Sequence, residues 1–142
     1  MKVYADPSFI VSLYTFDANS ASATRTMQDS SVRPLISTFG ELEVVNAMGL
    51  RTFRKEVSPA QARSSLLAFE KDLRDGLIQL RELADPILER ARQLSQQTTA
   101  KLGTRTSDLL HVAAALELGV EYFYSFDLQQ RKLAQVMRLR LN

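Results

Sequence analysis

Short apolar stretches rich in β-branched and aromatic residues alternate along this chain with longer segments of helical periodicity. The expected strands cover residues 3–5, 34–37, 77–80, 122–125 and 139–141. The expected helices cover residues 9–14, 20–29, 38–55, 58–74, 85–99, 104–118 and 128–136. Because strands that alternate with helices favour a parallel sheet covered by helices on both faces, we predict the α/β class.

Hydroxyl residues, proline and glycine mark the ends of several helices. Ser58 and Pro59 open one expected helix, since proline fits the first helical turn. Thr38 is the expected N-cap of the helix after the second strand, and Glu41 stands three residues on, where it completes a capping box. Gly119 is the expected C-terminal stop of the helix before the fourth strand.

Length and composition limit the number of domains, the compartment and the chemistry. The 142 residues, 45% of them hydrophobic, predict one domain over residues 1–142 with a sizeable core. No apolar run approaches the roughly 18 residues of a membrane helix. An acid at position 6 comes too early for a signal peptide, so we expect a cytoplasmic protein without a membrane partner. Zero cysteines exclude disulfides, thiolate zinc sites and thiol nucleophiles.

The net charge of +2 is nearly neutral and is weak evidence for a nucleic-acid partner. The distribution of charge matters more, because acids gathered in one cleft leave the rest of the surface more basic and suited to a phosphate polymer. Arg51, Lys101 and Arg105 lie near the candidate acids described next and are our candidates for contacts with RNA phosphates. Ordinary solvated side chains are the simpler interpretation of such residues.

Four acids stand where the chain passes from a strand or loop into a helix. Asp6 ends the first strand, Asp127 follows the fourth, and Glu43 and Asp108 lie in the first turns of their helices. Ligands of open parallel sheets bind beyond the carboxyl ends of the strands, so we expect these acids to converge there. Carboxylates about 4 Å apart repel by roughly 4 kcal/mol, which a divalent cation offsets. We therefore predict a Mg²⁺ or Mn²⁺ site that activates water for attack on a phosphodiester.

Each acid also has a simpler interpretation as a helix cap or a partner of the helix dipole. Glu41 competes with Glu43, but the two point to different faces of the helix, and Ala47 lies on the face of Glu43. We favour Glu43. His111 shares a helix face with Asp108, so the two form a conceivable metal pair. We favour instead a histidine that bonds a backbone carbonyl or borders the cleft.

Four segments resemble the motifs of the PIN-domain family, in the family's order and with suitable spacing. They are KVYADPS at residues 2–8, EVVNAM at 43–48, TSDLLHVAAAL at 106–116 and YSFD at 124–127. In length the chain resembles proteins of the VapC branch, the toxins of bacterial and archaeal toxin–antitoxin pairs. Two features depart from the pattern: Pro7 stands where Thr or Ser is commoner, and the segment before the last strand lacks the usual glycine.

The resemblance implies a PIN-like fold and a Mg²⁺- or Mn²⁺-dependent endoribonuclease that leaves a 5′-phosphate and a 3′-hydroxyl. It also implies inhibition by a cognate antitoxin protein and frequent homodimers. In this family pattern Asp6 and Asp108 are the principal metal ligands. Glu43 completes the set of metal ligands or holds a metal-bound water molecule. Asp127 supports these ligands without contacting the ion, or binds a second ion. The hydroxyls expected to bond the carboxylates or metal-bound water are Ser8 and Ser125.

Two other classes of function compete with this prediction. A degenerate PIN module would bind RNA or a protein partner without cleavage, although the presence of all four acids speaks against it. A phosphatase with Asp6 as its nucleophile would need a second Asp two positions on, where this chain has Ser8.

Aromatic and apolar residues offer weaker signals. We expect the phenylalanines in the core and regard Tyr14 as a possible platform for an RNA base. Leu66, Leu67 and Phe69 predict either a groove for a partner helix, such as that of an antitoxin, or packing between neighbouring helices.

Overall fold

The computed structural model describes residues 1–28 and 31–142. Within them the strands form one sheet in the order β3-β2-β1-β4-β5, and every neighbouring pair is parallel. The strands are β1 (Val3–Ala5), β2 (Leu35–Ser37), β3 (Gln79–Arg81), β4 (Tyr122–Tyr124) and β5 (Arg140–Leu141). Because β2 and β3 lie on one side of β1 while β4 and β5 lie on the other, the winding of the chain reverses between β1 and β4.

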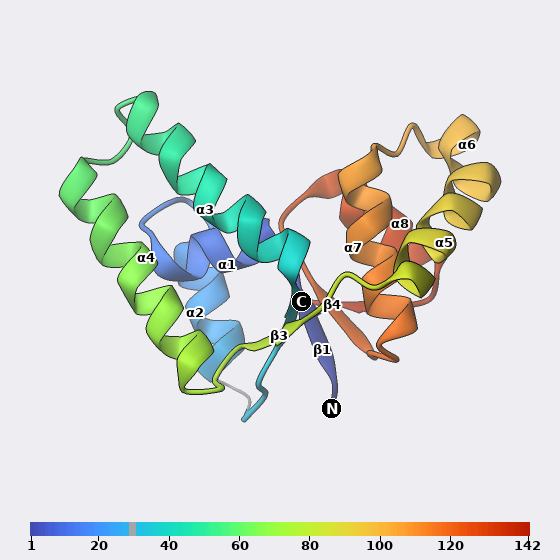
Figure 1. The fold of residues 1–142 in the computed structure, drawn as a ribbon, viewed down its shortest axis with the longest axis horizontal. Helices are drawn as coiled ribbons and strands as arrows, with labels where there is room; N and C mark the ends of the chain where they lie inside the picture. Colours follow the sequence, from blue (N-terminus) through green and yellow to red (C-terminus); the bar gives the residue numbers. More distant parts are fainter. Residues whose placement is uncertain (29–30) are drawn as a thin grey trace.

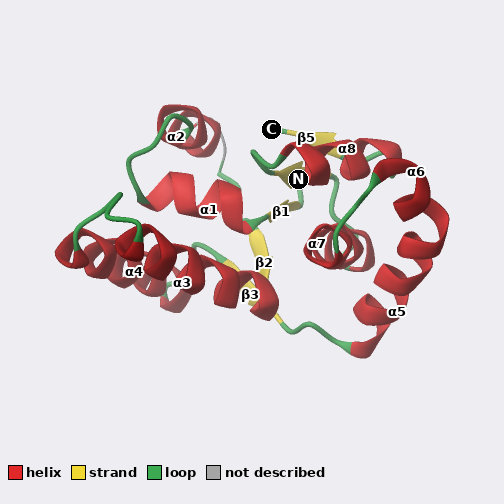
Figure 2. Ribbon diagram, turned by 90° about the horizontal axis from the view of Figure 1, so that it is seen from above, coloured by secondary structure: helices red, strands yellow, loops and turns green. Residues whose placement is uncertain are grey.

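Helices cover both faces of the sheet, as Figures 1 and 2 show. One layer consists of α1 (Pro7–Tyr14), α2 (Ser20–Gln28), α3 (Thr38–Phe53) and α4 (Pro59–Arg74). The other consists of α5 (Asp85–Leu94), the π-helical turn η1 (Ser95–Thr99), α6 (Ala100–Leu102), α7 (Thr106–Glu117) and α8 (Leu128–Val136). This architecture confirms the predicted α/β class with a parallel sheet between helices. The expected end of the second helix, Asp29, lies outside the described residues.

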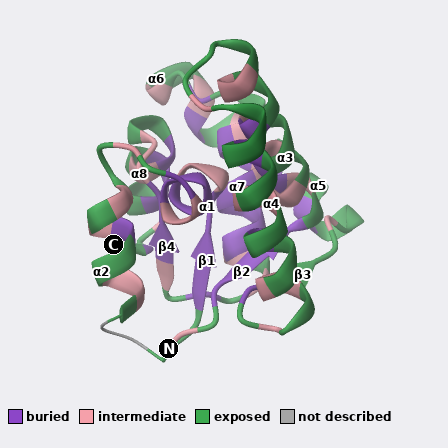
Figure 3. Ribbon diagram, turned by 90° about the vertical axis from the view of Figure 1, so that its left-hand side faces the viewer, coloured by how far each residue is buried: buried purple, intermediate pink, exposed green. Residues whose placement is uncertain are grey.

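Alternate residues of the central strand point to opposite helical layers, as the twofold period of a strand requires. Val3 and Ala5 belong to the core shared with α1, α3 and α4, whereas Tyr4 belongs to the core shared with α5, α7 and α8. All three are buried, and Figure 3 shows β1 in the colour of buried residues between β4 and β2. A strand buried on both faces reads as an unbroken apolar run, which explains the sequence of β1.

The N-cap of α3 is Ser37, which corrects the prediction of Thr38. Ser37 has an extended backbone, and its Oγ accepts a hydrogen bond from Gly40 N at 3.0 Å. Thr38 Oγ1 instead accepts from Leu83 N at 3.1 Å. The capping box predicted with Glu41 therefore does not form, because the residue that would anchor it is engaged elsewhere.

The third strand begins at Gln79, two residues later than predicted. Leu77 N and Ile78 N both donate to Asp72 O, at 2.9 Å and 3.3 Å, and so still close the end of α4. Strand pairing starts with the hydrogen bond from Gln79 N to Pro34 O at 2.9 Å. The apolar pattern alone does not reveal that the N–H groups of Leu77 and Ile78 are hydrogen-bonded to the end of the helix.

Glycine ends two of the longer helices. Gly76, with a φ of 75°, follows α4, and Gly119, with a φ of 66°, follows α7 as predicted. These left-handed conformations suit glycine, which has no Cβ to clash. Among the described residues no helix is both long enough and apolar enough to cross a bilayer.

Candidate functional site

Asp6 is fully enclosed at the carboxyl end of β1, where it caps α1. Its Oδ1 accepts hydrogen bonds from Phe9 N at 3.0 Å and Ser8 Oγ at 2.7 Å, and its Oδ2 accepts from Ser125 Oγ at 2.7 Å. Burial raises the pKa of Asp6 above its ordinary value, although these hydrogen bonds and the nearby His111 each lower it. Enclosure therefore disfavours the negative charge, and a cation nearby would favour it.

Ser8 and Ser125 join the end of β1 to the end of β4. Their Oγ atoms lie 3.3 Å apart, and Ser125 Oγ also accepts from Asp127 N at 2.9 Å. Asp127 in turn caps α8, because its Oδ1 accepts from Gln130 N at 3.0 Å. The structure thus brings Asp6 and Asp127 to the same edge of the sheet, with Ser125 between them.

Glu43 reaches this edge from α3 and is held by His111 of α7. His111 Nε2 is hydrogen-bonded to Glu43 Oε1, and His111 Nδ1 lies 2.8 Å from the Tyr4 hydroxyl oxygen. The histidine is fully buried, whereas the Glu43 side chain is 33% exposed. His111 therefore bonds two side chains, which corrects our interpretation of it as a residue that bonds the backbone or borders the cleft.

Asp108 is buried in the first turn of α7. Its Oδ2 accepts from Arg105 N at 2.8 Å and lies 3.9 Å from Arg105 Nε. Its Oδ1 is buried and has no hydrogen-bond partner in the described part of the chain. Since His111 follows Asp108 by about one turn, α7 carries both the carboxylate with the unpartnered oxygen and the histidine that holds Glu43.

A pocket of about 510 Å³ opens between the start of α1, α3 and the residues that follow β4. Ser8, Glu43 and Asp127 line it together with Asp17 and Arg51. Glu41, the rejected competitor of Glu43, instead lines a separate pocket of about 250 Å³ next to α4. Helix α3 thus presents its two acids to different surfaces.

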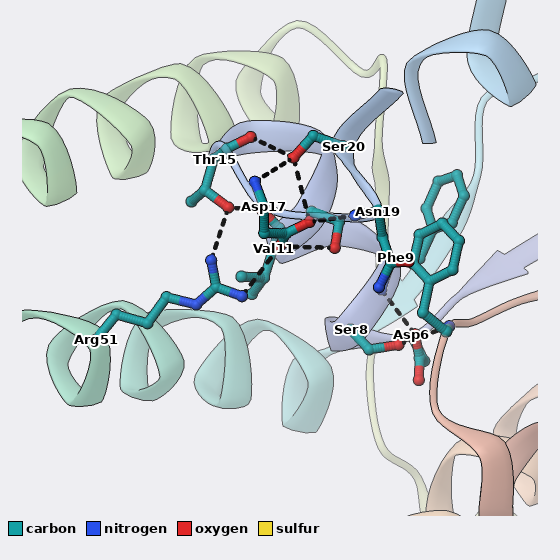
Figure 4. A network of polar contacts seen from close by, with 11 residues as sticks. Asp6, Ser8, Phe9, Val11, Thr15, Asp17, Asn19, Ser20 and Arg51 are labelled. Carbon is teal, nitrogen blue, oxygen red and sulfur yellow. Dashed lines mark hydrogen bonds and ion pairs between the residues drawn. The ribbon is translucent and has the colours of Figure 1, made fainter. Parts of the chain in front are cut away.

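Arg51 is anchored in the loop that follows α1. Its Nη2 donates to Asp17 Oδ2 and its Nη1 to Thr15 Oγ1, both at 3.0 Å. Figure 4 shows the guanidinium reaching from α3 to this loop, at the opposite end of α1 from Asp6. Its role in binding RNA stays a prediction. The other two candidates for RNA contacts, both exposed, are Lys101 and Arg105.

Three aromatic residues differ from expectation. Phe16, in the loop after α1, is 99% exposed, and Phe53, the last residue of α3, is 84% exposed. Tyr14 is part-buried, and its hydroxyl donates to Asp72 Oδ2 at 2.5 Å. Tyr14 therefore binds α4 and is not a free platform for a base.

A divalent cation fits the chemistry of the donors at this edge. Asp108 offers a buried oxygen without a partner, and Asp6 uses three of the roughly four lone-pair positions of a carboxylate. However, the described residues contain no group of three or more Asp, Glu or His side chains arranged to hold one ion. The predicted acids therefore do not form one set of ligands in the described part of the chain. Ser125 links Asp6 to Asp127, and Glu43 and Asp127 line one pocket, whereas the contacts of Asp108 are with Arg105.

Comparisons with known proteins identify the fold. No model of a known protein family and no curated protein sequence matches the chain. Among solved structures, the chain is similar to Mycobacterium tuberculosis VapC20, described as a sarcin–ricin loop cleaving toxin. The match has a TM-score of 0.71 and covers 92% of this chain and 94% of that chain, with 16% sequence identity. At this identity the likeness shows a shared fold, the PIN-like arrangement predicted from the sequence.

Proposed function

We propose that this chain is a cytoplasmic metal-dependent endoribonuclease, the toxin of a VapBC-type toxin–antitoxin pair, acting as one PIN domain. The observation that carries the proposal is Asp108, a buried carboxylate with an unpartnered oxygen, in a fold shared with a sarcin–ricin loop cleaving toxin. The proposed cofactor is Mg²⁺ or Mn²⁺, and the proposed substrate is RNA.

Asp6, Asp108 and Glu43 are the residues proposed to hold the cation. When bound, the cation supplies Lewis-acid activation of water and of the phosphodiester. Asp6 is kept in one orientation by three hydrogen bonds, and Glu43 has one oxygen bonded to His111 and the other left for the site. Asp127 has one oxygen committed to capping α8, which suits a supporting role beside the principal ligands.

The test is cleavage of end-labelled RNA by the purified protein in Mg²⁺, in Mn²⁺ and in EDTA. The substrates are a synthetic sarcin–ricin loop, which is the target named for VapC20, and an unstructured RNA. We expect cleavage only with metal and its loss in Asp6→Asn. The matched control is Asp75→Asn, an exposed acid at the end of α4 that pairs with Lys71. Equal cleavage by wild type and Asp6→Asn would contradict the proposal.

A second candidate function is a PIN module that binds RNA without cutting it. Two observations favour this candidate: Glu43 is already bonded to His111, and the described residues hold no preformed group of metal ligands. The same assay separates the two functions, because such a module would retard RNA in a gel in the presence of EDTA and leave it intact in Mn²⁺.

The proposal includes an antitoxin partner and a homodimer. Leu42, Val45 and Phe53 on α3 and Leu67 on α4 are all more than 40% exposed. A pocket of about 580 Å³ between the two helices, lined by Val45 and Leu67 among others, suits the apolar face of a partner helix. Phe69 is instead buried, and its ring lies edge-on to that of Tyr14 on α1, 5.6 Å away between centroids. Sedimentation of the isolated chain tests the homodimer, and a monomer at every concentration would contradict it.

A further inference from the structure

Four side chains form a hydrogen-bonded series beneath the acidic edge, which we name the buried chain. It runs from Ser37 through Tyr4 and His111 to Glu43. The Tyr4 hydroxyl donates to Ser37 Oγ at 3.0 Å and lies 2.8 Å from His111 Nδ1, and His111 Nε2 bonds Glu43 Oε1. The first three side chains are at most 1% exposed, so water does not compete for the hydrogen bonds between them.

The buried chain connects the three elements that carry the proposed metal ligands. Tyr4 lies on β1, two residues before Asp6. His111 lies on α7, three residues after Asp108, and Glu43 lies on α3. A hydrogen-bonded series that crosses these elements fixes their relative positions. It therefore ties together the parts of the fold that carry the three carboxylates, although it includes only one of them.

Close packing holds the His111 ring within this series. The Phe39 ring lies 5.4 Å from it between centroids. A Cβ added to Gly40 would lie 3.4 Å from His111 Cε1 and only 2.7 Å from Ile36 Cγ1. Because Gly40 has no side chain, the first turn of α3 approaches both residues closely. Burial also raises the pKa of Tyr4, so its hydroxyl keeps its proton.

We propose that Tyr4 and His111 are positioning residues that hold the Glu43 carboxylate for the cation, an inference that rests on the function proposed above. Glu43 is a long side chain at a part-exposed position, and it would lose rotamer freedom on binding a metal. The hydrogen bond to His111 restricts the rotamers of Glu43 before a metal binds. His111 itself does not serve as a ligand, because both of its ring nitrogens are already hydrogen-bonded.

The first test compares Tyr4→Phe and His111→Gln with the matched control Tyr122→Phe, a tyrosine on β4 outside the buried chain. Tyr4→Phe removes one oxygen atom and keeps the ring. Partners that orient metal ligands typically contribute about 10- to 100-fold to metal affinity or activity. We expect a fall of that size in Mn²⁺ affinity, measured by calorimetry, and in kcat, with the KM for RNA unchanged. The control should match wild type in all three.

The second test detects the hydrogen bonds of the buried chain by NMR, without metal or RNA. His111 is the single histidine of the sequence, so its ring signals in a nitrogen–proton NMR spectrum need no assignment. We expect a ring N–H signal protected from exchange with water. Tyr4→Phe and Glu43→Gln should shift that signal or expose it to exchange, whereas Tyr122→Phe should leave it unchanged.

The outcomes separate this inference from the proposed function. If wild type binds Mn²⁺ and cleaves RNA and Tyr4→Phe does both equally well, the positioning role is overturned and the proposed function stands. If wild type does neither, the proposed function falls, and the positioning role falls with it. If His111→Gln does not fold, Tyr4→Phe decides the question, since it removes no packed carbon atom.

Discussion

The carboxylate of Asp108 is held at one oxygen only. Oδ2 accepts the Arg105 backbone N–H, while Oδ1 is buried and unpartnered in the described part of the chain. A buried acceptor without a partner typically costs about 1–3 kcal/mol, and more when it is charged. A cation that binds Oδ1 would give this oxygen the partner that it lacks among the described residues.

Asp108→Asn should separate the cost of the unpartnered oxygen from the contribution of metal binding. Without metal, we expect the variant to lose no more than about 1 kcal/mol of unfolding free energy, because the substitution also removes a buried charge. With Mn²⁺ at a hundredfold excess over its Kd, wild type should gain about 2.7 kcal/mol and the variant should gain almost nothing. Urea unfolding with and without Mn²⁺ measures both. An equal gain in wild type and variant would contradict the assignment of Asp108 as a ligand.

Ser125→Ala should destabilise the junction between β1 and β4. Ser125 Oγ donates to Asp6 Oδ2 and accepts from Asp127 N, so its loss leaves both without this partner at a fully buried position. We expect a loss of about 1–3 kcal/mol in urea unfolding. Ser64→Ala, at an exposed position on α4, is the matched control and should change stability by less than about 0.5 kcal/mol. A similar small change in both variants would show that the junction adds little.

The acids of the candidate site are visible in the sequence because local signals mark them. Asp6 and Asp127 follow strands and cap helices, two roles that neighbouring residues reveal. The contacts of His111 are not visible in this way, because Glu43 lies 68 residues and Tyr4 lies 107 residues away in the chain. Only packing across the end of the sheet decides that these side chains meet.

At the scale of whole elements, the same local signals predict where helices and strands begin and end. Ser58 caps α4 and forms the capping box with Gln61, so sequence and structure agree on where this helix begins. The start of β3 and the cap of α3 differ from prediction for a shared reason. In both cases a backbone or hydroxyl group near the expected boundary bonds a partner outside the local segment, namely Asp72 O or Leu83 N.

The Arg51–Asp17 ion pair ties α3 to the loop after α1 and should depend on pH. Burial raises the pKa of Asp17, but hydrogen bonds from Asn19 N, Arg51 and Ser12 lower it more, so the folded pKa lies below its ordinary value. A lowered carboxyl pKa gives stability that is fully present above the unfolded pKa of about 4 and is lost as the pH falls through the folded pKa.

A double-mutant cycle with Asp17→Asn and Arg51→Met measures this contribution. At pH 7 we expect a coupling free energy of at most about 1 kcal/mol, as for other part-exposed pairs. The coupling should decline as the pH is lowered below about 4 and should weaken in high salt. A coupling near zero at pH 7 would mean that the bond to Thr15, and not the charge of Asp17, holds Arg51.

For the whole molecule, the alternation of strands and helices predicts a parallel sheet and two helical layers, but it does not predict the order β3-β2-β1-β4-β5. Strands of two or three residues are too short to specify their neighbours by sequence. Burial marks only the inner strands, because β1, β2 and β4 each contribute alternate residues to both cores. The reversal of winding beside β1 then creates the edge at which Asp6 and Asp127 lie.

The fold also redistributes charge between the interior and the surface. Asp6 and Asp108 are buried, so the exposed surface is more basic than the net charge of +2 indicates. Arg105 contacts Asp108 through its backbone while 73% of its side chain stays exposed, and Lys101 is exposed close by in the chain. A polyanion that approaches the enclosed acids would therefore meet these cations first.

Binding of single-stranded RNA should consequently weaken with salt, and Arg105 and Lys101 should account for part of the slope. For single strands each neutralised phosphate contributes about −0.7 to the slope of log K against log salt concentration. Arg105→Gln and Lys101→Gln should each make the slope shallower by about that amount, measured by fluorescence anisotropy in EDTA so that the RNA stays intact. Lys71→Gln, near the end of α4, is the charge-matched control and should leave the slope unchanged. If all three variants behave alike, RNA is attracted by the overall charge of the protein, and neither residue contacts a phosphate.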